Sequence, residues 1–164
     1  MLENHGFVLV GRITLELPAK FQIEFDDVPE ARWWRPAIYA FRISDEVVRI
    51  GKAKNLGERI CQWNKDVPRA LAGKFQNGGT NPWEAFEWRR RLVKHSQGEF
   101  LAQVGPTDMK LLGHLERKLI GYYNPCLCND SVCGRMRPPI ARSVKNVATA
   151  TEYWRSLNHS GDSE

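Results

Sequence analysis

The chain has no long apolar run. Its first 18 residues carry an acid at Glu3 and are interrupted at Gly11-Arg12, which is unlike a signal peptide. No other stretch is long and apolar enough to cross a bilayer. We therefore expect a cytoplasmic protein without a membrane partner.

Cysteine is also scarce, with four among 164 residues. In the cytoplasm these side chains are expected to be reduced thiols. Three of them lie in the stretch CLCNDSVC, residues 126–133, whose spacing differs from the paired C-x-x-C of common zinc sites. A zinc site would need Cys61 or a histidine as its fourth ligand. The spacing favours small apolar residues in a turn, and zinc remains the open alternative.

Internal repeats are absent, and the excess of positive charge is small, with 24 Lys and Arg against 19 Asp and Glu. The apolar share of 42% and the six tryptophans indicate one compact folded domain rather than a disordered chain. The charge fits either an ordinary surface or one that meets a polyanion, so it does not decide the function.

The amino-terminal part alternates apolar and polar residues. The pattern runs through residues 7–25 on both sides of Pro18, which predicts two strands of a β-hairpin. The next residues, 26–36, mix acids, prolines and the pair Trp33-Trp34. We interpret them as an irregular connection and favour an aromatic packing anchor over a base-stacking platform for the two tryptophans.

A second hairpin is predicted where the β-rich runs 36–43 and 47–53 are separated by a short polar turn. If Ile43 pairs with Val47, Phe41 faces Arg49 and Tyr39 faces Gly51. Tyr39 and Arg49 then lie as diagonal neighbours on one face.

The next segment begins with Asn55 as an N-cap and Glu58 at the third helical position, which predicts a short helix. Its buried stripe is expected to contain the apolar residues Leu56, Ile60 and Trp63. Arg59 then lies at the rim of that stripe, close to the hairpin.

Three further elements are predicted downstream. A helix starts at Pro82 and carries the arginines 89–91, and a third strand covers residues 99–105. Another helix is capped by Thr107, with Glu116 at the edge of its apolar stripe, which we expect to contain Leu111, Leu112, Leu115 and Leu119.

These elements predict an α/β (α+β) fold with a small central antiparallel three-stranded sheet flanked by helices. We divide the chain into a β extension and linker at 1–35, a core at 36–130, and a basic carboxy-terminal segment at 131–164 that ends in a closing helix.

The order of hairpin, arginine-bearing helix, third strand and carboxylate-bearing helix resembles the GIY-YIG endonuclease family. Arg59 follows Gly51 by eight positions, a spacing usual in that family, and the resemblance covers roughly residues 36–130. The stretches that carry it are AIY at 37–39, RIGKAKN at 49–55, LERKLI at 115–120 and NPCLCN at 124–129.

The resemblance implies a role for each matched residue. Tyr39 would position or deprotonate the attacking water, and Arg59 would hold the phosphate, which a guanidinium can do through two hydrogen bonds. Glu116 would bind one Mg²⁺ or Mn²⁺ ion per site, because hard cations prefer oxygen ligands. The family's asparagine would be Asn129, with Asn124 as the alternative.

The sequence departs from the family at three places. Ala37 replaces the first glycine of the motif, and Arg49 stands where the second motif has tyrosine. Arg49 could lower the pKa of Tyr39, contact the phosphate, or mark lost activity. The family's histidine or tyrosine after the helix arginine has no counterpart, because residues 60–94 contain neither type.

Basic residues around the predicted site are the expected DNA contacts. Lys52 and Lys54 flank it and could equally be solvated surface residues. The spacing of Arg89 and Arg90 favours a solvated helix face with one or two contacts to a DNA backbone. The segment 135–145 is basic as well.

The sequence thus predicts a magnesium-dependent DNA endonuclease acting on double-stranded DNA, of restriction, phage or mobile-element type. A restriction enzyme would need a second active site, hence a homodimer or sequential nicks. The alternative is a catalytically impaired domain that kept the fold and binds nucleic acid.

Overall fold

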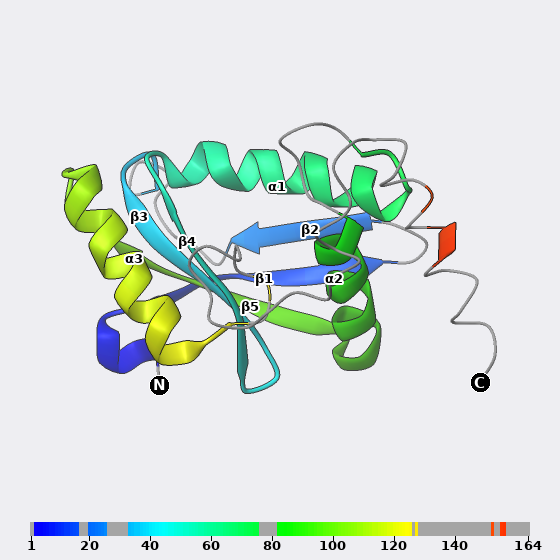
Figure 1. Ribbon diagram of the computed structural model, residues 1–164, viewed down its shortest axis with the longest axis horizontal. Coiled ribbons are helices and arrows are strands. Elements are labelled where there is room, and N and C mark those ends of the chain that lie inside the picture. Colours follow the sequence, from blue (N-terminus) through cyan, green and yellow to red (C-terminus); the bar gives the residue numbers. More distant parts are fainter. Residues whose placement is uncertain are drawn as a thin grey trace.

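The computed structural model describes residues 2–16, 20–25, 33–75, 82–125, 127, 152 and 155–156. None of the helices described there is long and apolar enough to cross a membrane. The elements follow in the order η1 (Leu2–His5), β1 (Val8–Glu16), β2 (Lys20–Phe25), β3 (Ala37–Ile43), β4 (Glu46–Ala53), α1 (Leu56–Leu71), α2 (Pro82–His95), β5 (Gln97–Val104) and α3 (Met109–Tyr123) (Figure 1).

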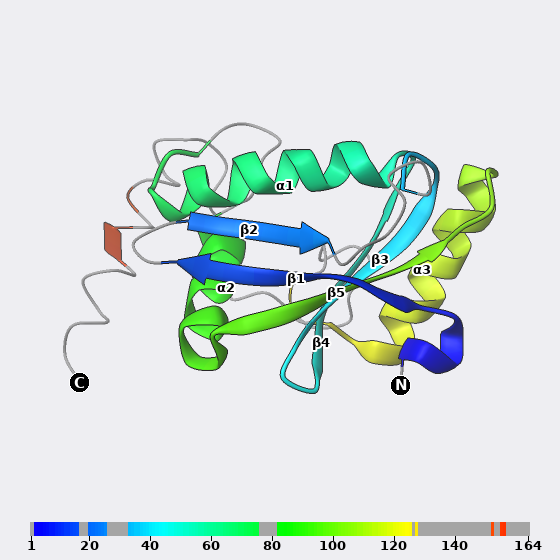
Figure 2. The same ribbon diagram turned by 180° about the vertical axis from the view of Figure 1, so that it is seen from behind.

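The strands form one antiparallel sheet of five, in the order β2-β1-β5-β3-β4. The α+β class is confirmed, but the predicted three-stranded sheet is too small. The amino-terminal hairpin joins this sheet, because β1 pairs along β5, with Val8 opposite Ala102 and Ile13 opposite Gly98 (Figure 2). This pairing satisfies the backbone groups that an edge strand at β5 would leave open.

The second hairpin has nearly the predicted register. Tyr39 lies opposite Gly51 and Phe41 lies opposite Arg49, as expected. The predicted pairing of Ile43 with Val47 is wrong, because an irregularity after Phe41 brings Ile43 opposite Glu46. The turn is therefore shorter than predicted, and its Ser44 has a positive φ of 54°.

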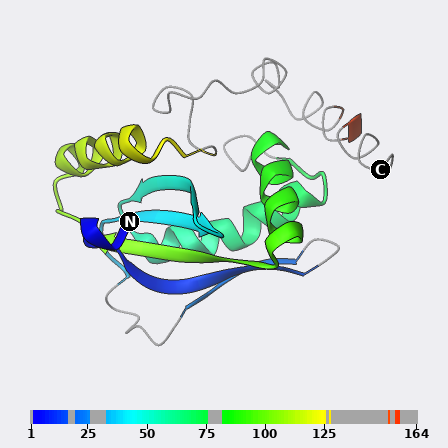
Figure 3. The same cartoon turned by 90° about the horizontal axis from the view of Figure 1, so that it is seen from below.

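Side chains alternate between the two faces of the sheet and build a hydrophobic cluster on each. Tyr39 and Phe41 belong to the cluster that includes Trp63 of α1 and Trp88 of α2. Ile38 and Ala40, whose side chains point to the other face of the sheet, belong to the second cluster. That cluster includes the α3 residues Leu112, Leu119 and Ile120. Figure 3 shows α2 and α3 at opposite ends of the molecule.

Helix α1 begins as predicted, since the Asn55 side chain accepts a hydrogen bond from the Glu58 amide at 3.2 Å. The helix is longer than expected, with 16 residues and Pro68 inside it. Leu56, Ile60 and Trp63 are all buried, which confirms the predicted stripe.

The N-cap of helix α3 is Asp108, so the predicted N-cap at Thr107 is wrong by one residue. The Asp108 carboxylate accepts a hydrogen bond from the Lys110 amide at 2.8 Å. A negative charge at this position also suits the positive end of the helix dipole. The predicted stripe changes accordingly, because Leu111 is exposed while Leu112, Leu119 and Ile120 are buried.

Candidate active site

Tyr39 lies over the backbone of Gly51 in the neighbouring strand. Its side chain is only 2% exposed, and its ring contacts the rings of Phe41, Trp63 and Phe100. A methyl group at Gly51 would lie 2.5 Å from the Tyr39 hydroxyl oxygen. Only glycine therefore leaves room for the phenol to reach this part of β4.

Substituting alanine for Gly51 should destabilise the fold, because the aromatic neighbours of Tyr39 prevent its ring from moving away. We expect Gly51→Ala to lower the free energy of unfolding by about 1–3 kcal/mol, the range found for overpacking. Urea denaturation measures this loss.

Gly121→Ala is the matched control, since a methyl group at Gly121 in α3 would have nothing within 4 Å. Alanine is the better helix former, so this variant should be as stable as the original chain or more stable. Equal stability of Gly51→Ala and the original chain would show that the Tyr39 ring can move aside with no loss in the free energy of unfolding.

Glu116 reaches β4 from helix α3. One carboxylate oxygen, Oε1, accepts a hydrogen bond from the Lys52 backbone amide at 3.0 Å, and Oε2 lies 2.7 Å from the Lys52 ammonium. Because β4 is an edge strand of the sheet that the described residues form, this amide has no partner strand there to bond to. The small Gly113 leaves room for the ammonium, since a methyl group there would lie 3.0 Å from Nζ.

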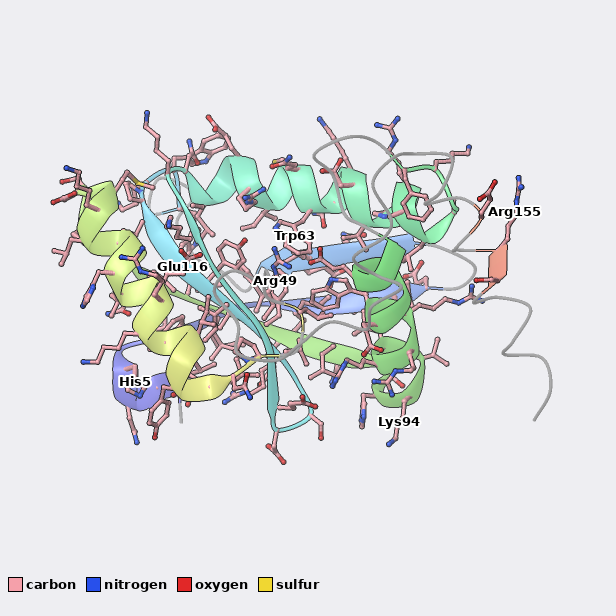
Figure 4. All side chains as sticks on the ribbon, in the orientation of Figure 1. His5, Arg49, Trp63, Lys94, Glu116 and Arg155 are labelled. Atoms are coloured by element: carbon pink, nitrogen blue, oxygen red, sulfur yellow. The ribbon has the colours of Figure 1, made fainter. Side chains whose placement is uncertain are left out.

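Tyr39 and Glu116 thus approach consecutive residues of one strand. The phenol lies against Gly51, and the carboxylate is bonded to the amide of Lys52. They come from the two sides of the sheet, since Tyr39 belongs to the cluster with α1 and α2, whereas Glu116 is on α3. Figure 4 shows Glu116 on the side of α3 that faces the sheet, with Arg49 and Trp63 near the middle of the molecule.

Arg59 lies in the first turn of α1, which follows directly after β4. The side chain is half-buried, and its Nη1 donates a hydrogen bond to Gln62 Oε1 at 2.8 Å. Helix α1 covers the face of the sheet that carries Tyr39. The phosphate-binding role of Arg59 stays a prediction.

Arg49 points into the protein. Its Nη1 donates to the Glu84 carboxylate of α2 and, at 2.7 Å, to the backbone carbonyl of Leu127. Its guanidinium carbon lies 4.7 Å from the centroid of the Trp63 ring. The side chains of Arg49 and Glu84 are only 15% and 9% exposed. The guanidinium is therefore part of the interior, beside the aromatic cluster that holds Tyr39.

Sequence reasoning missed Glu84. An acid in the first turn of a helix indicates capping, and this ordinary interpretation concealed a buried partner for Arg49. The signal in the sequence was the spacing of Glu84 and Glu87, which places both acids on one face of α2. The structure buries that face. Buried carboxylates need partners, so two of them on one helix predict buried arginines.

The other basic candidates lie in two different places. Lys52 lies near the end of β4 and is bonded to Glu116, and Lys54 follows that strand just before the start of α1. Arg89 and Arg90 belong to α2, which lies far from α3 in Figure 1. Arg90 is exposed and forms an ion pair with Glu87 at 2.8 Å, which offsets part of its charge.

Several predicted features lie wholly or mostly outside the described residues. Asn129 and the basic segment 135–145 are outside, and the cysteine-rich stretch 126–133 is described only at Leu127. Asn124, the alternative to Asn129, is described. It ends α3 in a left-handed conformation with φ 46°, and its amide donates to the Ile120 carbonyl.

A divalent cation fits the chemistry at Glu116. In the described part of the chain, no three His, Cys, Asp or Glu side chains gather in a cluster. Magnesium nevertheless binds proteins through one or two carboxylates and takes its remaining ligands from water and substrate phosphates. Both oxygens of the Glu116 carboxylate are bonded to Lys52, so a bound cation would displace the Lys52 ammonium from Oε2.

No protein-family model matches the chain, and no curated protein matches it either. The solved structures that are similar to it include the following two. Restriction endonuclease HPY188I, in complex with product DNA, has a TM-score of 0.44 and 14% identity, covering 82% of this chain and 84% of that one. A mutant of bacteriophage T4 EndoII has a TM-score of 0.54 and 21% identity, covering 77% of this chain and 95% of that one. The chain therefore shares the fold of the phage protein EndoII.

Proposed function

We propose that this protein is a divalent-metal-dependent DNA endonuclease of the GIY-YIG type, cutting double-stranded DNA. The observation that carries the proposal is the approach of Tyr39 and Glu116 to consecutive residues of β4. The fold shared with the phage protein EndoII supports it. The ordered motifs around Tyr39, Arg59 and Glu116 support it independently.

In this proposal each side chain meets one demand of phosphodiester hydrolysis. Tyr39, held by its aromatic neighbours, positions the attacking water through its hydroxyl group. Arg59 binds the non-bridging oxygens of the scissile phosphate with its planar guanidinium. Glu116 holds the cation, which when bound stabilises charge on the phosphate and the leaving oxygen.

Two lysines, Lys52 and Lys54, and the buried Arg49 have supporting roles in this proposal. Lys52 pairs with Glu116 and, together with Lys54, adds positive charge where the DNA backbone would pass. Arg49 replaces the second motif tyrosine but contacts Trp63 and Glu84, so it supports the site from within. Cutting both strands requires a homodimer or two successive nicks.

The buried position of Arg49 is also the observation that favours a second candidate function. A domain without the second tyrosine, whose replacement is engaged with Glu84, could bind DNA without cleaving it. Plasmid cleavage separates the two candidates.

The test is conversion of supercoiled plasmid in Mg²⁺ by the unaltered chain and by Arg59→Ala. We expect cleavage with Mg²⁺, none with EDTA, and a loss of about 100- to 1,000-fold in Arg59→Ala, the effect of removing one preorganised donor to a developing negative charge.

Arg69→Ala is the matched control, because Arg69 is an exposed arginine in the last turn of the same helix. It should cleave at nearly the original rate. If the unaltered chain binds DNA but leaves supercoiled, linear and branched DNA intact in Mg²⁺ and Mn²⁺, the non-catalytic candidate is correct.

A further inference from the structure

The two neighbouring tryptophans before β3 have different environments. Trp33 is buried in the cluster that contains Tyr39, which confirms the predicted packing anchor. Trp34, in contrast, is 49% exposed and is among the large hydrophobic side chains on the surface. Trp34 therefore fits the predicted packing role only in part.

Trp34 is held firmly against the start of α1. The Gly57 amide donates to the Trp33 carbonyl at 3.0 Å, and the Leu56 amide donates to the Arg35 carbonyl at 3.2 Å. These two bonds fix the backbone on both sides of Trp34. The indole packs on Gly57, where a methyl group would lie 3.1 Å from its Cε2 atom. One part of the ring is thus supported by the helix while the rest meets solvent.

Basic residues lie close to this exposed ring along the chain. Arg35 follows this tryptophan directly and Lys54 lies two positions before the start of α1, and both side chains are exposed. Arg59 lies two positions after Gly57, so its side chain is on the other flank of α1. Glu58 is the acid in the first turn of this helix. The amino-terminal end of a helix adds a partial positive charge of its own. An exposed aromatic near cations is complementary to a nucleic acid, whose bases stack and whose backbone is anionic.

We propose that Trp34 is a stacking platform for a DNA base at the start of α1. This inference rests on the proposed function, since it takes DNA as the occupant. A base inside a duplex has no free face, so the preferred substrate has an unpaired or unstacked base where the DNA meets this end of α1. Bulged, mismatched or frayed DNA belongs to this class.

The test measures binding of bulged and fully paired DNA in EDTA by fluorescence anisotropy. Trp34→Ala should raise the dissociation constant for bulged DNA about 5- to 150-fold, the effect of removing one base–aromatic stack. Trp34→Phe, which keeps an aromatic face, should recover most of the affinity. The salt dependence should not change, because no cation is removed.

A 2-aminopurine placed in the bulge reports stacking directly. Its fluorescence should be quenched by the unaltered chain and by Trp34→Phe, and not by Trp34→Ala. The matched control is Tyr122→Ala, which removes a 71% exposed aromatic from α3 and should bind as the unaltered chain does. Thermal melting verifies that each variant is folded.

Unchanged binding by a folded Trp34→Ala, or equal losses in Trp34→Ala and Trp34→Phe, would overturn the stacking platform. Because EDTA prevents metal-dependent cleavage, this outcome is separate from the proposed function. Binding of bulged DNA through Trp34 without any cleavage would support the stacking platform and contradict the proposed endonuclease. Cleavage with no contribution of Trp34 to binding would support the endonuclease and contradict the stacking platform.

Discussion

Replacing Glu116 with glutamine should stop Mg²⁺-dependent DNA cleavage while the chain stays folded and still binds DNA. The glutamine side chain is nearly isosteric and can still accept the hydrogen bond that Glu116 Oε1 receives from the Lys52 amide at 3.0 Å. It has no negative charge for a cation. A bound cation contributes several kcal/mol to phosphoryl transfer, so we expect a loss of about 1,000-fold or more in the rate of plasmid cleavage.

The stability of Glu116→Gln should fall only modestly, because Lys52 is 36% exposed and its ammonium can turn to water once the 16% exposed carboxylate loses its charge. Pairs with a partner that reaches solvent contribute about 1 kcal/mol or less to the free energy of unfolding. Melting temperature and DNA affinity measured beside the cleavage rate therefore distinguish a lost metal ligand from a damaged fold.

The control is Glu24→Gln, which removes an exposed carboxylate from β2, at the opposite edge of the sheet. Its cleavage rate should be unchanged. Cleavage at the original rate by Glu116→Gln would show that another group binds the cation and that Glu116 only closes the edge of β4.

The sequence predicts local structure well in this protein. The register that places Tyr39 opposite Gly51 follows from alternation on either side of a short turn. The start of α1 follows from the cap at Asn55. In both cases the deciding interactions join residues close in the chain, so the signal lies within a short window.

Contacts between residues that are far apart in the chain leave no comparable signal in a short window of the sequence. Glu116 and Lys52 are 64 positions apart, and a glutamate surrounded by basic residues on a helix is usually solvated. The pairing of β1 with β5 was missed for the same reason, because nothing in residues 8–16 specifies which edge they join. Resemblance to a family related Glu116 to the site, and the structure added that its partner is Lys52.

Removing Glu84 should be among the most destabilising single changes in the chain. Its carboxylate and the Arg49 guanidinium form a pair in which the side chains are 9% and 15% exposed. Loss of the Glu84 carboxylate removes a buried opposite charge from the Arg49 guanidinium, which costs about 3–5 kcal/mol. For a chain of this size, Glu84→Ala should lower the melting temperature by about 10 °C or more.

Glu46→Ala is the comparison for the Glu84 variant. Glu46 is exposed and pairs with Arg91 at 2.6 Å, so its loss should cost about 1 kcal/mol or less. Equal melting temperatures for Glu84→Ala and Glu46→Ala would mean that water reaches Arg49 and that the pair is not a buried one.

The double variant Arg49→Met/Glu84→Leu separates support of the fold from chemistry at the site. Apolar residues of similar volume often replace a buried ion pair at little cost, so this variant should melt well above Glu84→Ala. Because Arg49 donates to Glu84 and to the Leu127 carbonyl, we expect its cleavage rate to follow the folded fraction. A folded double variant that no longer cleaves would instead place Arg49 at the phosphate, in the role that tyrosine has in the second family motif.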